Sequence, residues 1–448
     1  MPALLADRGG LHGHPLAQGL AIPRLAQRLA RPRVAYTLVA AAAALPRLLV
    51  LALERDEILV AYVDKSDTFA RTLVDHGTFG FIPGQPSAYT QPLYGHFLTA
   101  VYWWLGREWW TAGGAQILAA VATACVVLAI GRRFLSPAAG LAGALLTTLH
   151  PYLVWHDVHL NREILDQLAA AVVILLTLHA LERLDVVRAG ALGAALGVSI
   201  LGNARLALLP VAVLALLAWR HRSRRLLGAA AVLVGACAIT LLPWVARNAS
   251  VVGCVAITTD SRALWKANNL NTYDVLARGD WIDQVPLPPG APPSPQDAGA
   301  IYEETGRIVP VDECEQLDTY QELVLEFWQE QPGEKARLAG QAVGFLWQPS
   351  VMRTEGRSEQ GGKVDSLRDW VEPLYMIPVY ALALAGLALA PRRFAVVAVT
   401  MLGYQTAVAM IFAGTTRYRV PWDFLLMLLA GVTLARLLER RRHGVTTI

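Results

Sequence analysis

The chain has 448 residues, of which 55% are hydrophobic and 17% charged, and its formal net charge is +4. A soluble domain carries about a quarter charged residues and lacks repeated apolar runs of about 20 residues. The composition therefore excludes a soluble protein. The short basic clusters at the ends of apolar runs also exclude a nucleic-acid-binding module. The runs do not alternate with period two, as outer-membrane barrels do, so an all-α polytopic membrane protein is predicted.

Ten apolar runs predict about ten transmembrane helices with both termini inside. They are 34–53, 113–131, 136–155, 164–182, 188–204, 206–219, 226–245, 371–390, 394–413 and 420–437. The Arg-rich residues 1–33 resemble a cytoplasmic leader to an uncleaved anchor. With this orientation, all five later basic clusters lie on the cytoplasmic side, as the positive-inside rule requires. These clusters are 132–133, 183–188, 220–225, 391–393 and 439–443.

The connecting segments divide into domains. Residues 34–245 form an N-terminal transmembrane module whose first outer loop is 54–112, and residues 371–437 form the C-terminal helices before a cytoplasmic tail at 438–448. The shorter apolar segments 91–106 and 336–349 are expected to be juxtamembrane helices at the outer surface, because they are short for a crossing and rich in aromatic residues.

The Pro- and Gly-rich segment 246–370 is expected to form a small extracytoplasmic cap of loops and helix, with a helix at 318–331. Cys254 and Cys314 both lie in this segment. An oxidising compartment would allow them to form a disulfide, and the alternative is two free thiols. Cys125 and Cys237 lie within spans and are interpreted as packing residues.

The first outer loop begins with VDKSDTFARTLVDHG (63–77). Asp64 and Asp67 are three residues apart, a spacing that places two side chains on one face of a helix. Paired carboxylates suit a general base with an orienting partner, or ligands to a hard cation such as a divalent metal ion. The alternative is a solvated turn in which Lys65 and Arg71 balance the charge, and the spacing alone does not separate these interpretations.

The second outer loop, WHDVHLNRE (155–163), brings further charges to the membrane surface. Such charges are paired or line a polar cavity. Asp157, His159 and Glu163 have the chemistry of metal ligands, but their spacing matches no zinc motif. Pairing with Arg162 or with the first-loop carboxylates accounts for them equally well.

Three arginines, Arg205, Arg417 and Arg419, lie near the outer ends of spans, where a guanidinium can clamp an anionic headgroup. Snorkelling also explains Arg205. In TTRYRVPWDF (415–424) a proline follows the arginines where an apolar helix begins, an arrangement that suits a phosphate site. Acids and cations on the outer face together indicate a reaction on a lipid-borne anionic substrate.

The order of these segments resembles the GT-C superfamily of integral-membrane glycosyltransferases, and within it the branch of protein O-mannosyltransferases and the lipid A aminoarabinose transferase. The matching segments are DTFARTLVDHG (67–77), AYTQPLYGHFLTAVYWWLG (88–106), HPYLVWHDVHLNREILDQL (150–168), WVARNASVVGCVAITTDSRALWKANN (244–269) and RYRVPWDFLLMLLAG (417–431). Gln91 stands where the family's surface-helix motif has its first proline.

The resemblance implies transfer of a sugar from a polyprenyl-phosphate donor to an extracytoplasmic acceptor by inverting displacement. Asp67, with Asp64 as the contender, would be the general base, and Glu163 would support the acceptor or a metal ion. The arginines would bind the carrier phosphate. Further candidate substrate-binding residues are Asp157, His159, Arg162, Tyr89, Asn268 and Asn269.

This sequence has VDKSDTF where family members often have adjacent acids, so the choice between Asp64 and Asp67 stays open. It does not specify the sugar, hexosyl or pentosyl, or whether the acceptor is a glycan, lipid or protein. A transporter or flippase of lipid-linked sugars is the alternative function, and a scaffold is a third. A transporter typically carries charges within its spans and internal repeats, whereas here the charges collect at one face. The expected location is the inner or plasma membrane.

Overall fold

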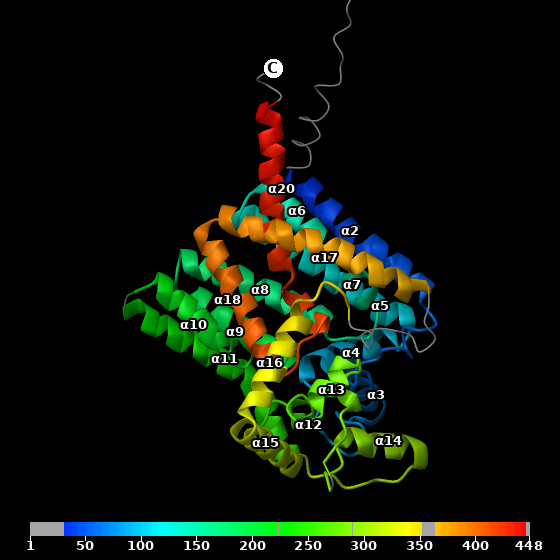
Figure 1. Cartoon of the computed structure of the whole chain (residues 1–448). Helices are drawn as coiled ribbons and strands as arrows, with labels where there is room; N and C mark the ends of the chain where they lie inside the picture. The colour runs from blue at the N-terminus through cyan, green and yellow to red at the C-terminus, as the bar shows by residue number, and fades with distance from the viewer. Residues whose placement is uncertain (1–30, 223, 289, 352–362, 445–448) are drawn as a thin grey trace, which may run out of the picture.

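The computed structural model describes residues 31–222, 224–288, 290–351 and 363–444. Within these ranges the fold is helical, and the only β-type pairing is an isolated bridge between Ile82 and Gln85. The predicted all-α membrane fold is confirmed (Figure 1). Most of the predicted leader, residues 1–30, and the last four residues of the tail lie outside the described ranges.

Six helices in the described ranges are long and apolar enough to cross a membrane. They belong to α2 (Pro32–Leu53), α5 (Trp109–Phe134), α8 (Glu163–Glu182), α11 (Arg224–Val251), α17 (Lys363–Leu389) and α18 (Arg392–Ile411). A seventh span results if α20 (Phe424–Gly444) is joined to the short helices α19 (Thr416–Arg419) and η3 (Val420–Trp422), which meet it at 56°.

The predicted count of about ten crossings is not confirmed, because three of the predicted spans are short helices. They are α6 (Pro137–Thr148), α9 (Val186–Gly202) and α10 (Leu209–Arg220). A helix of 12 residues, such as α6 or α10, is about 18 Å long, whereas the hydrocarbon core is about 30 Å thick.

The predicted span 136–155 is not one helix. α6 ends at Thr148, and α7 (Pro151–His156) begins after two intervening residues. Pro151 has no backbone N–H, and a proline disfavours the helical conformation of the residue before it. His150 accordingly has a non-helical backbone, with φ −59° and ψ 121°. Proline chemistry therefore breaks the apolar run into two helices.

Close packing between helices depends on glycines. A Cβ atom added at Gly193 of α9 would lie 2.2 Å from the carbonyl oxygen of Leu233 on α11, and one added at Gly197 would lie 3.0 Å from that of Cys237. Small residues allow backbones to approach in this way in membrane helices, where the hydrophobic effect does not drive helices together. α9 and α11 are consequently in direct backbone contact.

Two further helices lie beside the bundle, away from the C-terminal end of α20 (Figure 1). α3 (Ser66–His76) belongs to the first loop, and α4 (Pro92–Leu105) follows it. α4 begins with Pro92 and ends before Gly106, whose φ is 79°. Its last turn exposes Trp103 and Trp104 by 66% and 80%, as expected for an interfacial helix.

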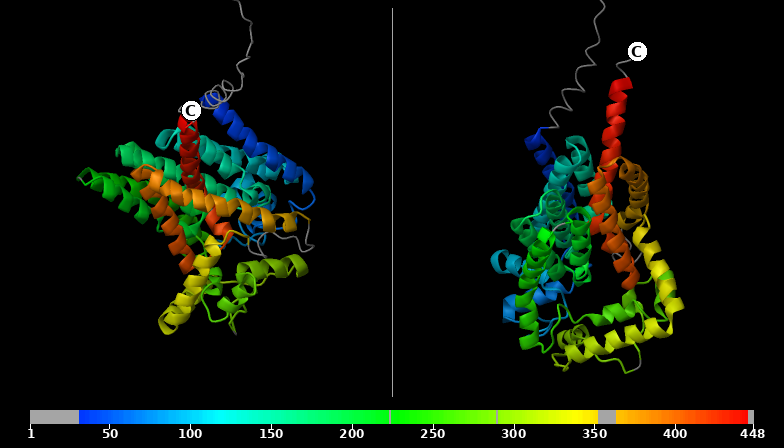
Figure 2. Two further views of the ribbon diagram at one scale, coloured as in Figure 1. Left: turned by 45° about the horizontal axis from the view of Figure 1, so that its top comes forward. Right: turned by 90° about the vertical axis from the view of Figure 1, so that its left-hand side faces the viewer.

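The segment between α11 and α17 forms a cap at one end of the molecule, whereas the C-terminal end of α20 lies at the other (Figures 1 and 2). Its helices are α12 (Ser261–Lys266), α13 (Thr272–Ala277), η2 (Ile282–Gln284), α14 (Pro295–Thr305), α15 (Glu313–Glu330) and α16 (Pro332–Trp347). Cys254 and Cys314 form a disulfide with Cα atoms 5.6 Å apart. Their predicted pairing is confirmed.

The glycine contact generates a stability prediction. Gly193→Ala places a methyl group against the Leu233 carbonyl, so we expect it to lower the free energy of unfolding by about 1–3 kcal/mol. Gly235→Ala on α11 is the matched control, because a Cβ atom there meets nothing within 4 Å. Thermal unfolding of the purified variants in detergent measures both, and equal melting temperatures would contradict the role of Gly193.

Candidate active site

A polar cavity of about 650 Å³ lies between the bundle and the cap. Its walls come from the first loop, the start of α8, the α9–α10 junction, the cap and the α18–α19 junction. The charged and aromatic lining residues include Asp64, Lys65, Tyr89, Arg162, Arg205, Asp260, Arg262, Lys266, Arg417 and Tyr418. The structure therefore brings together five of the predicted site residues: Asp64, Tyr89, Arg162, Arg205 and Arg417.

Arg417 links three segments that are far apart in the sequence. Its Nε donates to Oε1 of Glu163 over 2.5 Å, and its Nη2 donates to Asn161 over 3.2 Å and contacts Oδ2 of Asp64 at 3.5 Å. Glu163, the first residue of α8, is 2% exposed and does not line the cavity itself. Its carboxylate therefore orients Arg417 from a buried position outside the cavity lining.

Asp64 has one oxygen fixed by the chain and the other near Arg417. Its Oδ1 accepts hydrogen bonds from the backbone N–H of Ser66 at 2.9 Å and from the Ser66 hydroxyl at 2.7 Å. Its side chain is 11% exposed. The carboxylate is thus oriented by the start of α3 while Asp64 remains part of the cavity wall.

Asp67 has a different environment. Its carboxylate accepts hydrogen bonds from Nε and Nη2 of Arg107 at 2.9 and 2.8 Å, and from the Tyr102 hydroxyl at 2.6 Å. It is 2% exposed and is not among the cavity-lining residues. The expected shared helix face is not formed, because α3 begins at Ser66, after Asp64. Asp67 instead joins α3 to α4 and the loop that follows it.

Arg205 lines the cavity beside Tyr418, the residue that follows Arg417. Its guanidinium carbon is 3.4 Å from the centroid of the Tyr418 ring, and its Nε donates to Oδ1 of Asn203 over 3.1 Å. Stacking on an aromatic face and one hydrogen bond hold a planar guanidinium in a fixed orientation. Arg162, which also lines the cavity, donates to the side-chain oxygen of Gln91.

The cap supplies a set of charged lining residues that the sequence interpretation did not assign. Lys65 of the first loop forms an ion pair with Asp260, and its Nζ lies 4.4 Å from the centroid of the Tyr89 ring. Burial, together with Asp260, raises the pKa of Tyr89 well above its usual value, so the phenol stays protonated and can donate a hydrogen bond. Burial lowers the pKa of Lys266. The only sequence signal for this wall was the charged pattern of TTDSRALWK (258–266).

Two predicted residues of the second loop are buried away from the cavity. Asp157 accepts hydrogen bonds from Nε and Nη2 of Arg47 on α2, at 2.9 and 2.7 Å. His159 lies 3.0 Å from a carboxylate oxygen of Glu54, and its ring stacks on Trp155 with centroids 4.0 Å apart. These contacts fasten the loop to the end of α2.

Arg419, Asn268 and Asn269 are also not among the residues that line the cavity. Arg419 is 1% exposed, with Nε 3.1 Å from both carboxylate oxygens of Asp423 and Nη1 bonded to the carbonyls of Leu346 and Gln348. The Asn268 oxygen accepts from the Trp328 indole over 2.9 Å. Asn269 bonds only within its own turn, among its described contacts.

In the part of the chain that the structure describes, no group of three or more His, Cys, Asp or Glu side chains is arranged to hold a metal ion. The acids that the sequence offers as ligands have other partners. Asp64 and Glu163 share Arg417, and Asp157 bonds to Arg47.

The fold is that of a polytopic helical membrane protein, as the sequence predicts, and a family model and solved structures support the resemblance to the GT-C superfamily. A family model described as dolichyl-phosphate-mannose-protein mannosyltransferase matches residues 89–246. No curated protein sequence matches the chain.

Two solved structures of an oligosaccharyltransferase from Archaeoglobus fulgidus share the fold. The first, AglB in complex with an inhibitory peptide and a dolichol-phosphate, is 12% identical, with a TM-score of 0.50 over 92% of this chain and 52% of that one. The second, tethered to an acceptor peptide, is 11% identical, with a TM-score of 0.51 over 90% of this chain and 50% of that one. The chain thus spans about half the length of these structures.

A third structure, ArnT from Cupriavidus metallidurans bound to undecaprenyl phosphate, matches more weakly. It is 16% identical, with a TM-score of 0.41 over 89% of this chain and 77% of that one.

The contacts of the two aspartates predict a loss of stability for one substitution and little change for the other. Asp67→Asn removes the charge that pairs with Arg107, so we expect a loss of about 1–3 kcal/mol. Asp64→Asn keeps an oxygen for Ser66 to bond and should melt close to the parent protein. Asp75→Asn, at an exposed position of α3, controls for the substitution itself. Melting curves in detergent compare the three, and a stable Asp67→Asn protein would contradict the structural role.

Proposed function

We propose that the protein transfers a sugar from a polyprenyl-phosphate donor to an acceptor hydroxyl group in the cavity between bundle and cap. One observation carries the proposal: the carboxylate of Asp64, oriented by Ser66, lies in one cavity with the guanidinium groups of Arg162, Arg205 and Arg417. A base and an anion-binding site are the two groups that such a displacement needs. The GT-C fold and the family match support this class of reaction.

The arginines would bind the carrier phosphate, which is the leaving group. Guanidinium groups bind phosphate oxygens through paired, charge-assisted hydrogen bonds. Arg205 is oriented by Tyr418 and Asn203, and Nη1 and Nη2 of Arg205 have no partner among the described residues. Arg205 is therefore the arginine best arranged to receive a phosphate, with Arg417 as a second guanidinium in the same cavity.

Asp64 would be the general base. As the acceptor oxygen forms its bond to the anomeric carbon, its proton passes to the Asp64 carboxylate. The bond from the anomeric carbon to the phosphate oxygen breaks, and its electron pair leaves with the phosphate. Displacement in a single step inverts the anomeric configuration. Asp67 acts indirectly, because its bonds to Arg107 and Tyr102 hold α3 against α4.

A neighbouring apolar groove fits the hydrocarbon chain of the donor. The groove measures about 730 Å³ and is lined by α3, α4, α9 and α11, with Phe79, Leu93 and Trp244 among its walls. Pro92 and Leu93 line the groove, and the adjacent Gln91 lines the polar cavity. A lipid phosphate in the cavity can thus extend its chain around the start of α4 into this groove.

The cavity is proposed to face the extracytoplasmic side. α9 begins near Arg188 and ends next to Arg205, whereas α18 begins at Arg392 and ends next to Phe412, which lines the cavity. The basic clusters therefore lie at the helix ends opposite the cavity, and such clusters mark the cytoplasmic side. The disulfide in the cap fits an oxidising compartment.

Asp64→Asn tests the assignment of the base. We expect the turnover of a polyprenyl-phosphate sugar, identified from a panel of such donors, to fall by about 10²–10⁴-fold, the usual contribution of a general base. Asp75→Asn, exposed on the same loop, should retain full activity. Turnover by the Asp64→Asn enzyme at the parental rate would rule out Asp64 as the base, and absence of turnover by the parent with every donor would rule out the reaction.

Arg205→Gln tests the phosphate site. Loss of charged hydrogen bonds to a phosphate should weaken binding of polyprenyl phosphate by about 10-fold or more. The measurement is the dissociation constant of polyprenyl phosphate for the purified protein, with Arg71→Gln, exposed on α3, as the matched control. Unchanged affinity in Arg205→Gln would place the phosphate elsewhere.

A further inference from the structure

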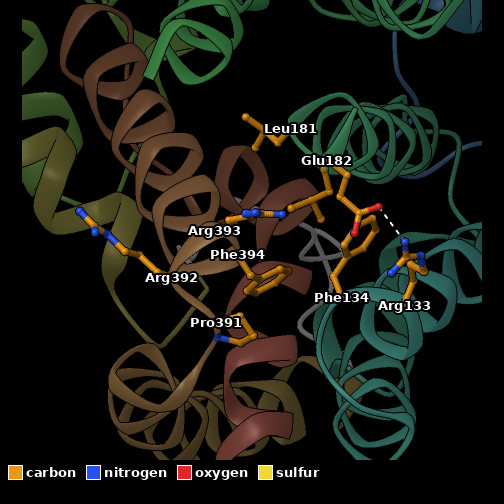
Figure 3. Close-up of a pocket in the computed structure, with 9 residues that line it drawn as sticks. Arg133, Phe134, Leu181, Glu182, Pro391, Arg392, Arg393 and Phe394 are labelled. Carbon is orange, nitrogen blue, oxygen red and sulfur yellow. Dashed lines mark hydrogen bonds and ion pairs between the residues drawn. The ribbon is translucent and has the colours of Figure 1, made fainter. Parts of the chain in front are cut away.

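A second pocket, of about 390 Å³, lies between the C-terminal ends of α5 and α8 and the start of α18 (Figure 3). Apolar and charged residues line it together. They are Arg133, Phe134, Leu178, Leu181, Glu182, Pro391, Arg392, Arg393 and Phe394. None of these residues lines the polar cavity or the apolar groove.

This pocket lies at the opposite end of the bundle from the candidate active site. α8 runs from Glu163, which holds Arg417, to Glu182 in the pocket, and α18 runs from Arg392 in the pocket to the residue before Phe412. Both helices have 20 residues, and such a helix is about 30 Å long, the thickness of the hydrocarbon core. The pocket is therefore at the level of the other membrane surface.

The basic residues of the pocket are divided between two sides. Arg133 extends from the end of α5, and Arg393 points across the pocket toward the end of α8 (Figure 3). Arg392 points the other way, with its guanidinium carbon 5.9 Å from the Trp219 ring centroid. Two guanidinium groups thus approach one space from different helices.

Only one acid in the pocket balances these charges. Glu182 binds Arg133 at 2.8 Å, and the two side chains are 30% and 57% exposed. Arg393 makes no ion pair with any residue that the structure describes. The pocket consequently carries an excess of positive charge above a floor formed by Phe134, Leu178, Leu181 and Phe394.

We propose that this pocket binds an anionic phospholipid of the membrane, with its phosphate between Arg133 and Arg393 and the upper part of its acyl chains against Phe134 and Phe394. Basic pockets between transmembrane helices on the cytoplasmic side bind anionic headgroups in this manner. The apolar floor at the bilayer surface favours a lipid over a soluble phosphate ester. Because α5 and α8 belong to the N-terminal module and α18 to the C-terminal helices, the bound lipid joins the two parts. This inference does not depend on the reaction proposed above.

Native mass spectrometry of the full chain in detergent measures the binding. The probes are phosphatidylglycerol and phosphatidylcholine, added separately. We expect tighter binding of phosphatidylglycerol, and a decrease of its affinity by about fivefold for Arg133→Gln or Arg393→Gln, from the usual contribution of one basic residue near an anionic surface. Arg436→Gln, at an exposed arginine of α20, is the control and should bind as the parent does.

A variant with the opposite expected sign separates binding from folding. Glu182→Gln removes the carboxylate that competes for Arg133, so it should bind phosphatidylglycerol more tightly than the parent, a gain that misfolding cannot produce. Four results would each overturn the proposal. Two concern the variants: a loss of phosphatidylglycerol affinity in Arg436→Gln equal to that in the pocket variants, or no gain of affinity in Glu182→Gln. The other two are equal binding of the two lipids by the parent protein and displacement of the lipid by millimolar inorganic phosphate.

Discussion

The site depends on the contacts of the Arg417 guanidinium with two carboxylates. The guanidinium binds Glu163 at the start of α8 and contacts Asp64 in the first loop, so one side chain from the C-terminal part of the sequence joins two loops of the N-terminal module. At the edge of a bilayer, an unpaired charge is costly, and removal of one partner of a buried pair leaves the other uncompensated. The geometry of the cavity therefore requires all three segments at once. A phosphate that enters the cavity shares Arg417 with these carboxylates, whereas Arg205 keeps two nitrogens without a protein partner among the described residues.

Much of the fold could be predicted from the sequence, because a membrane imposes simple rules on it. Apolar runs and basic ends predicted the helices, and the spacing of polar segments predicted which of them meet. The helix lengths could not be predicted, because an apolar run does not reveal where Pro151 interrupts it or that α10 has only 12 residues. The glycines of α9 did not predict a backbone contact with α11, because that contact depends on which helices become neighbours.

The candidate site was predicted in part, for a related reason. Residue type and position identified the charges at the outer end, but the choice of partner is a property of the tertiary structure. The sequence favoured Asp67 as the base over Asp64 and offered Asp157 as a substrate-binding residue, yet Arg107 and Arg47 bind these two aspartates and keep them from the cavity wall. Arg47 lies inside an apolar run, and the sequence did not predict a partner for its charge. Asp260, Arg262 and Lys266 come from the family-like segment 244–269, but no role was predicted for them from the sequence, so their position over the site follows only from the fold of the cap.

The disulfide between Cys254 and Cys314 closes a loop with a sequence separation of 60 residues. That loop includes Asp260, Arg262, Lys266 and Asp297, which line the cap side of the cavity. In the chain-entropy description, such a cross-link stabilises the folded state by about 4 kcal/mol. The order of the cap side of the cavity is thus linked to oxidation of these two thiols. A copy of the chain kept reduced would lose this contribution, so the stability of the cap depends on the redox state of its surroundings.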